Sequence, residues 1–151
     1  MLRPYKREPC ARSDLARGFV CLPHHRKGRS LIVEPMGERE TRVGEALLAL
    51  ASVEKSDERT PQVVARRAAE MLAEHARKLK VNTIVLHSFA HLFAELAAPA
   101  IAVDVLKETE RLLCAEGFSV TRSPFGWFNE LEIKAKGHSL SRLARTITAE
   151  D

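Results

Sequence analysis

The stretch Thr60–Leu86, TPQVVARRAAEMLAEHARKLKVNTIVL, determines the fold class of this chain. Thr60 is a residue type that favours a helix N-cap, and Pro61 follows at the first helical position, where proline loses no hydrogen bond. Apolar residues then recur at spacings of three and four, which predicts an amphipathic helix with one buried stripe, made of Val64, Ala68, Met71, Leu72, Ala76 and Leu79. Thr83–Leu86 is short and rich in β-branched residues, which predicts a buried strand. A helix that leads into such a strand is expected to pack on a sheet.

The segments on the carboxyl side of this stretch continue the succession of strands and helices. Pro99 opens a second amphipathic helix that ends at Gly117, and its expected buried face consists of Ala102, Val105, Leu106, Leu112 and Leu113. Phe118–Thr121 is predicted as a strand. Residues 128–135 alternate between polar and apolar side chains, which predicts another strand, and a last short helix is expected to begin near Ser139.

The amino-terminal side supplies the remaining predicted strands. Phe19–Leu22 and Leu31–Glu34 are short and β-rich, and the polar segment His24–Ser30 between them is expected to form a basic hairpin or loop. Glu45–Val53 is interpreted as a central strand that enters a polar loop at Glu54–Glu58, although its alanines and leucines would also suit a helix. The predicted fold is an α/β (α+β) domain with a single sheet, two longer helices and one short helix packed mainly on one face.

The composition is that of one globular domain. A chain of 151 residues buries roughly two-thirds of its unfolded surface. Hydrophobic residues make up 45% and charged residues 29%, without an apolar run long enough for a membrane span, so we expect neither a membrane protein nor a wholly disordered chain. Three cysteines without a close pairing pattern favour a reducing compartment, so a cytoplasmic location is expected.

Positive charge is concentrated at the amino-terminal end. Residues 1–30 contain two acidic residues and eight basic ones, which are Arg3, Lys6, Arg7, Arg12, Arg17, Arg26, Lys27 and Arg29. This segment therefore has a net charge of +6, whereas the whole chain has +4. Residues 1–16 carry prolines and charges without an apolar period, so they are expected to form a basic arm before a folded domain at residues 17–151. Such charge is typical of a segment that binds nucleic-acid phosphates, and a solubilising tail is the alternative.

The sequence lacks the common nucleotide-binding and hydrolase motifs GxGxxG, GxxxxGK, HExxH and GxSxG, and it lacks a CxxC pair. His87, His91 and Glu95 would share a face only on one continuous helix, and His87 ends a predicted strand, so a pocket or surface histidine is favoured over a metal ligand. A second set matches no standard zinc spacing: Cys10, Cys21, His24 and His25. No metal and no cofactor is therefore expected.

Two further segments have residue types that bind ligands. Lys136, Gly137 and His138 precede the expected last helix, and a helix N-terminus favours anions, whereas a plain glycine turn is the alternative. The stretch Pro124–Phe128 contains the single tryptophan of the chain in an aromatic turn with a glycine. Such a turn suits either core packing or the stacking of a base or sugar.

Three motifs, of which these segments are part, occur in a fixed order along the chain. The first is Phe89, Ala90, His91 and Leu92 with Glu95, Leu96, Ala97 and Pro99; the second is Ser123, Pro124, Phe125, Gly126 and Trp127; the third is Lys136, Gly137 and His138 with Leu140, Leu143, Arg145 and Thr146. In this order and spacing the motifs resemble the N-terminal editing domain of archaeal threonyl-tRNA synthetases. The resemblance extends over residues 45–147 and more loosely over residues 18–44.

The resemblance implies the fold of the D-aminoacyl-tRNA deacylases and a specific reaction. Members of the family bind the 3′ adenosine of charged tRNA and hydrolyse serine wrongly attached to threonine tRNA, and backbone groups and the terminal ribose 2′-hydroxyl position the water. An activated ester needs little more than an oriented water and a stabilised oxyanion. For this chain, the resemblance implies His91 and Asn129 as catalytic residues and a substrate pocket that contains Pro124, Phe125, Gly126, Trp127, Phe128, Lys136, Gly137 and His138.

RNA is the expected partner, either the 3′ end of a tRNA or ribosomal RNA, and neither DNA nor a membrane is expected. The RNA-binding residues are expected to be the eight basic residues of segment 1–30 together with Arg142 and Arg145. A homodimer and a complex with a synthetase subunit are both open as assemblies.

The chain departs from the family pattern at pocket positions. Phe128 and Asn129 stand where the family usually has tyrosine and lysine, and Ser139 and Arg142 stand where it has proline and glutamate. A hydroxyl and a cation are thereby lost, and a carboxylate is replaced by a guanidinium. Two hypotheses follow: an editing enzyme that clears Ser-tRNA(Thr), or a catalytically degenerate RNA-binding module associated with tRNA or the ribosome.

Overall fold

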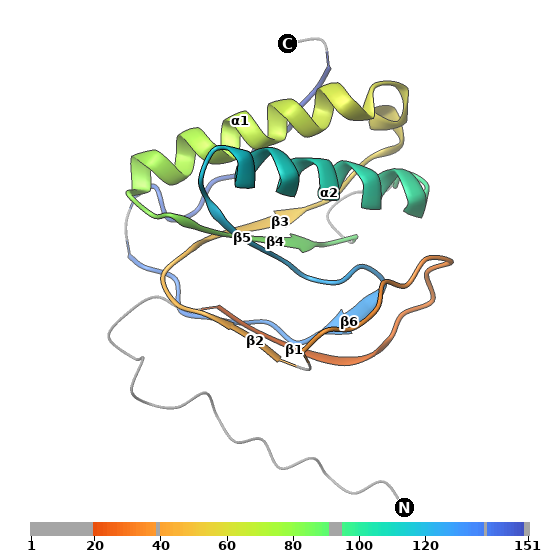
Figure 1. Ribbon diagram of the computed structural model, residues 1–151, viewed down its shortest axis with the longest axis horizontal. Helices are drawn as coiled ribbons and strands as arrows, with labels where there is room; N and C mark the ends of the chain where they lie inside the picture. Colours follow the sequence, from red (N-terminus) through yellow and green to blue (C-terminus); the bar gives the residue numbers. More distant parts are fainter. Residues whose placement is uncertain (1–19, 39, 91–94, 138, 150–151) are drawn as a thin grey trace, which may run out of the picture.

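The computed structural model describes residues 20–38, 40–90, 95–137 and 139–149. In chain order the elements are β1 (Val20–Lys27), β2 (Glu40–Val43), β3 (Leu47–Ala51), the 3-10 helix η2 (Lys55–Arg59), α1 (Pro61–Leu79), β4 (Thr83–Ser88), α2 (Pro99–Ala115), β5 (Ser119–Arg122), β6 (Trp127–Asn129) and β7 (Glu132–Ile133). They form three layers, with α1 and α2 side by side above the sheet of β3, β4 and β5, and the strands β1, β2 and β6 below it (Figure 1).

The two predicted long helices and the predicted strand between them are confirmed. Helix α1 follows Thr60, has Pro61 in its first turn and is capped at its carboxyl end by Lys80, whose φ of 57° is left-handed. Its buried residues are Val64, Ala65, Ala69, Leu72, Ala73 and Ala76. The buried face is therefore shifted from the predicted stripe toward the alanines, because α2 covers that side of α1 and small side chains let two helices approach closely.

The sheet beneath the helices is parallel, with the strand order β3-β4-β5. Glu45–Val53 does contain a strand rather than a helix, but β3 lies at the edge of this sheet, so the expected central position is wrong. Strand β4 is central, and its Ile84, Val85 and Leu86 are buried because apolar layers cover both faces. Its carboxyl end therefore lies between those of its two neighbours.

The lower layer is a second, antiparallel sheet in which β1 pairs with β2, β6 and β7. The α/β class is confirmed, whereas the expected single sheet is wrong. Strand β1 continues to Lys27, so the loop expected from His24 begins later than predicted. Pairing with β6 explains this, because it extends the strand into the polar stretch His24–Lys27, with a register shift between His24 and Arg26.

The predicted strand at Leu31–Glu34 is wrong. This segment is irregular in the structure, and the Leu31 side chain is 95% exposed. The Glu34 N–H donates to the Phe125 carbonyl oxygen at 3.0 Å instead of joining a ladder. Pro35 follows directly and cannot donate a backbone hydrogen bond, so a regular strand cannot continue there.

The short helix predicted near Ser139 is also wrong, since residues 139–149 contain no helix. Leu140 and Leu143, which would form its apolar face, are exposed. A short helix without a packed apolar face is marginal in water. The polar loop predicted at Glu54–Glu58 instead contains the 3-10 helix η2.

Two glycines join the loop after β1 to the turn after β5. Gly28 N–H donates to the Gly126 carbonyl oxygen at 2.7 Å, and a Cβ on Gly28 would lie 2.8 Å from that oxygen. Gly126 has a φ of +86°, and a Cβ there would lie 2.5 Å from the Ile32 carbonyl oxygen. Only glycine fits both positions without displacing backbone.

Gly126→Ala is therefore expected to destabilise the protein by about 2 kcal/mol or more, since it combines a left-handed alanine with a backbone clash. For a chain of this size the loss lowers Tm by at least about 4 °C, which thermal unfolding followed by circular dichroism measures. The matched control is Gly44→Ala, because a Cβ on Gly44 meets nothing within 4 Å. Equal Tm values for the two variants would show that the turn does not need a glycine.

Candidate functional site

The carboxyl ends of the three parallel strands lie at one edge of the sheet, which is where open α/β sheets bind ligands. Phe89, after β4, donates its N–H to the Ala51 carbonyl oxygen of β3 at 2.8 Å. Ser123, after β5, donates its N–H to the Leu86 carbonyl oxygen of β4 at 2.9 Å. The turn Pro124–Trp127 continues directly from Ser123, so the second sequence motif lies at this edge.

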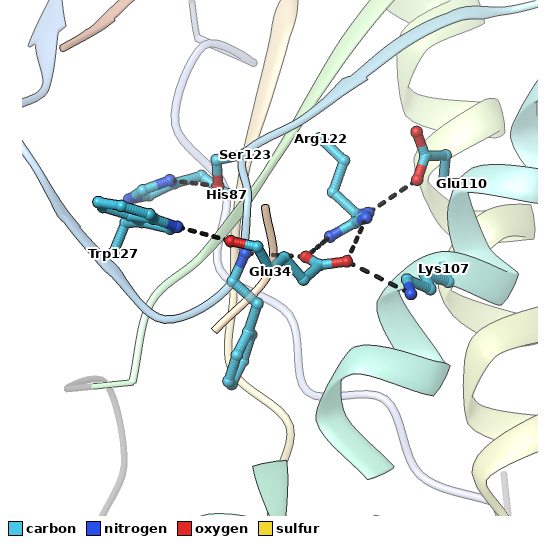
Figure 2. Close-up of polar contacts among 8 residues, drawn as sticks. Glu34, His87, Lys107, Glu110, Arg122, Ser123 and Trp127 are labelled. Carbon is cyan, nitrogen blue, oxygen red and sulfur yellow. Dashed lines mark hydrogen bonds and ion pairs between the residues drawn. The ribbon is translucent and has the colours of Figure 1, made fainter. Parts of the chain in front are cut away.

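A buried polar pair lies beside this turn. His87 of β4 is 6% exposed and Ser123 is 3% exposed. The His87 Nδ1 and Ser123 Oγ atoms are 2.8 Å apart and share a hydrogen bond, as Figure 2 shows. The sequence favoured a pocket or surface histidine at His87 over a metal ligand, but it did not predict the pairing with Ser123, which depends on contact between two strands. The signal in the sequence was a histidine and a serine near the ends of two predicted strands.

The Glu34 carboxylate is the centre of a hydrogen-bonded network (Figure 2). Arg122 donates two hydrogen bonds to it, at 2.5 and 3.0 Å, and a third to Glu110 of α2 at 2.7 Å. Lys107 Nζ of α2 lies 3.4 Å from the same carboxylate. The side chains of Glu34 and Arg122 are only 12% and 13% exposed, so the network joins the loop after β1 to β5 and α2 in a mostly dry environment.

The same residue also holds the backbone of the turn. The Phe125 N–H donates to the Glu34 carboxylate at 2.8 Å, and the Glu34 N–H donates to the Phe125 carbonyl oxygen. The Trp127 indole Nε1–H donates to the Glu34 carbonyl oxygen at 2.9 Å. Both backbone groups and the side chain of Glu34 are therefore used to fix residues 125–127. Nothing in the sequence pattern singled out Glu34, because its partners lie about ninety positions away.

The network lowers the pKa of the Glu34 carboxyl. Burial raises this pKa, but hydrogen bonds from Arg122 and from the Phe125 N–H, together with the charge of Arg122, outweigh burial and bring it to about 2. Burial lowers the pKa of Arg122, but hydrogen bonds to Glu34 and Glu110 and the charges of these two carboxylates outweigh burial and raise it. Glu34 is thus ionised at any ordinary pH, and its role is structural rather than that of a proton donor.

The predicted pocket residue Phe128 lies on the opposite side of β6 from Trp127, since successive residues of a strand face opposite ways. Its ring is 45% exposed, and the Arg26 guanidinium carbon lies 5.0 Å from the ring centroid. Arg26 pairs with Phe128 across β1 and β6, and Lys27 pairs with Trp127. The structure thus brings two predicted RNA-binding residues next to two predicted substrate-binding residues.

Residues of the third motif lie away from the turn Pro124–Trp127. Lys136 forms an ion pair with Glu45, which precedes the amino-terminal end of β3, whereas the turn lies at the carboxyl ends. Gly137 is exposed, and Arg142 and Arg145 are exposed in the irregular carboxyl-terminal segment. Their roles in binding stay predictions.

Several predicted site residues lie outside the described part of the chain: Arg3, Lys6, Arg7, Arg12, Arg17, His91 and His138. Within the described ranges, no group of three or more His, Cys, Asp or Glu side chains could hold a metal ion. A separate groove lies between α1 and the carboxyl-terminal segment, lined by Arg67, Glu70, Met71, Glu74, Thr146, Ile147 and Thr148.

The chain is thus an α/β domain in which a hydrogen-bonded aromatic turn lies beyond the carboxyl ends of the parallel strands. The chain belongs to the archaea-specific editing domain family of threonyl-tRNA synthetase, whose model matches residues 24–147. The family predicted from the three motifs is therefore confirmed.

Curated relatives agree with this assignment. The threonine–tRNA ligase of Methanopyrus kandleri is 43% identical over 112 residues, which cover 74% of this chain and 18% of the ligase. Those of Methanobrevibacter smithii and Methanocaldococcus jannaschii are 45% and 39% identical over 71% and 83% of this chain. The chain spans about a fifth of the length of these relatives. No helix in the described ranges has the length and apolar character that a membrane span requires.

Glu34→Gln is expected to lower the stability at pH 7 by about 3 kcal/mol, because a carboxyl whose pKa falls from 4.5 to about 2 on folding gains that much from its partners. This stabilisation is complete above pH 4.5 and is lost as the pH falls toward 2. The Tm difference between parent and variant should therefore shrink over this window, as measured by Trp127 fluorescence during heating.

The control for this experiment is Glu108→Gln, which removes a partly exposed carboxylate paired with the exposed Arg111 on the same helix. It should change Tm little, because exposed ion pairs contribute little to stability. A Glu34→Gln protein as stable as its parent at pH 7, or a Tm difference that does not depend on pH, would contradict the role assigned to Glu34.

Proposed function

We propose that this chain is an editing domain that hydrolyses the ester bond of Ser-tRNA(Thr). Membership of the threonyl-tRNA synthetase editing family supports a tRNA-related editing role. The proposed partner is the 3′ end of a charged tRNA, in the setting of translation, and the chain acts with a threonyl-tRNA synthetase.

The turn Pro124–Trp127 is the observation that carries the proposal. It combines a family motif with a position beyond the carboxyl ends of parallel strands. It is held by the Glu34 carboxylate, by the Gly28 N–H and by the strand contact of Ser123. Ester hydrolysis by water depends on groups that are already oriented before the reaction, because reorganisation then costs nothing in the transition state.

In this proposal the side chains assist a reaction led by the backbone. The turn residues Pro124, Phe125, Gly126 and Trp127 position the terminal adenosine and the seryl group, and the substrate's own 2′-hydroxyl orients the attacking water. His91 and Asn129 contact the seryl ester. Asn129 is half-buried on β6, where it pairs with His24 of β1, and its amide can donate a hydrogen bond to an oxyanion but cannot neutralise the charge.

A second candidate function follows from the departures at Asn129 and Arg142. A module that has lost both the family's lysine and its glutamate would bind tRNA or ribosomal RNA without hydrolysing the ester. The exposed Arg26, Lys27 and Arg29 favour RNA binding under either hypothesis.

The experiment is the hydrolysis of Ser-tRNA(Thr) by the purified protein, with spontaneous ester decay subtracted. Serine release should exceed threonine release from Thr-tRNA(Thr) by about tenfold or more, because the additional methyl group of threonine must be excluded from a pocket that fits serine. Circular dichroism on the same preparation establishes that the protein is folded. No serine release above background from folded protein would contradict the proposal and favour the RNA-binding module.

Asn129→Lys, which restores the family's cation, is expected to raise the rate of serine release by about tenfold, since a preorganised charge stabilises the developing oxyanion. The matched control is Asn82→Lys, which adds the same charge at an exposed position between α1 and β4. His91→Ala should lower the rate with little change in Tm. If Asn129→Lys and Asn82→Lys have the same rate, position 129 does not contact the reacting ester.

A further inference from the structure

We propose that the exposed Arg26–Phe128 stack, flanked by Lys27 and Arg29, is a docking platform for the single-stranded 3′ segment of an RNA. The platform lies outside the turn that holds the terminal nucleotide and would bind nucleotides that precede it. The choice of RNA rests on the proposed function, whereas the platform itself rests on the geometry of β1 and β6.

Contacts across the lower sheet build the stack. Arg26 and Phe128 are register partners on β1 and β6, and the guanidinium carbon lies 5.0 Å from the ring centroid. Phe128 is 45% exposed although it is a large apolar side chain, and Arg26 is exposed as well. The stack leaves the outer face of a planar cation open to a second planar group.

The cations at this end of β1 carry uncompensated charge. Within the described residues, Arg26, Lys27 and Arg29 form no ion pair, whereas carboxylates pair with Arg42, Arg77, Lys78, Lys107, Arg111, Arg122 and Lys136. Three unpaired cations within four residues, beside an exposed aromatic ring, create a local positive potential. A polyanion is therefore the occupant that the charge favours.

The two-glycine contact places this charge beside the turn. The Gly28 N–H donates to the Gly126 carbonyl oxygen at 2.7 Å, so the chain between Lys27 and Arg29 touches the turn directly. An RNA strand whose last nucleotide lies at the turn would pass the platform before reaching it. The platform and the turn are thus direct neighbours at the backbone.

Stacking distinguishes single-stranded RNA from other polyanions. An unpaired base can stack on the guanidinium face of Arg26 or on the ring of Phe128, while the phosphates contact the edge N–H groups of Arg26 and the flanking cations Lys27 and Arg29. Bases within a duplex are already stacked on each other, and acidic peptides have no comparable planar group. The proposal therefore predicts a preference for unpaired RNA in addition to a dependence on salt.

The test uses fluorescence anisotropy with a labelled single-stranded RNA that ends in the sequence CCA. Arg26→Ala and Arg29→Ala should each reduce the slope of log Kd against log salt by about 0.7, the value for one lost phosphate contact on a single strand. Arg26→Lys and Phe128→Leu should weaken binding by about fivefold or more without changing the slope, because they remove stacking and keep the charge.

The matched control is Arg66→Ala, which removes an exposed cation from α1 in the opposite layer (Figure 1). It should leave both the slope and the affinity near the parent values. The platform would be overturned by an unchanged slope in Arg26→Ala, by equal loss in Arg66→Ala, or by equally tight binding of a blunt RNA duplex. Equal competition by polyglutamate would identify a general polyanion surface and would also overturn it.

The experiments can contradict the platform and the proposed function independently of each other. Single-stranded RNA binding with the expected variant pattern, but without serine release, would contradict the editing reaction and support the platform. Serine release that Arg26→Ala and Phe128→Leu leave unchanged, together with unchanged RNA affinity, would support the editing reaction and contradict the platform.

Discussion

The candidate site depends on the ion pair between Glu34 and Arg122. Both side chains are nearly buried, and breaking one partner of such a pair is costly because the other charge then stays uncompensated. Glu34 lies in a loop without regular structure, yet its carboxylate and both its backbone groups bind β5, the turn and the Trp127 indole. Arg122 in turn binds Glu110 of α2. One residue therefore couples the helix layer, the parallel sheet and the turn where the substrate is proposed to bind.

Sequence patterns predicted the parts of the fold that local periodicity controls. A local apolar pattern marks the helices that begin at Pro61 and Pro99 and the buried strand that begins at Thr83. A short stretch of sequence is therefore enough to predict that each element exists and whether it is a helix or a strand. The strand at Leu31–Glu34 was predicted wrongly. Its β-rich residues contact the turn at Gly126 instead of pairing with a neighbouring strand. Glu34 itself was not predictable as a site residue, since its partners are distant in sequence and ionic partners leave no periodic signal.

The family motifs singled out the turn Pro124–Trp127, which lies beyond the carboxyl ends of the parallel strands, but they could not separate the two faces of β6. Trp127 bonds to the Glu34 loop, whereas Phe128 lies exposed under Arg26. The two faces of β6 therefore have different proposed roles. The face with Trp127 belongs to the turn that positions the seryl ester, and the face with Phe128 binds the RNA strand. The replacement of the family's tyrosine by Phe128 removes a hydroxyl from the exposed face and leaves the Trp127 side unaltered.

The central claim is that the turn held by Glu34 is the place where the acylated adenosine binds. The most direct measurement is a ¹⁵N NMR titration with an adenosine that carries serine through an amide at its 3′ position, which cannot be hydrolysed like the ester. The account predicts the largest shifts at the backbone of Phe125 and Gly126 and at the Trp127 indole N–H. Shifts confined to the groove between α1 and residues 146–148, with the turn unchanged at saturation, would contradict it.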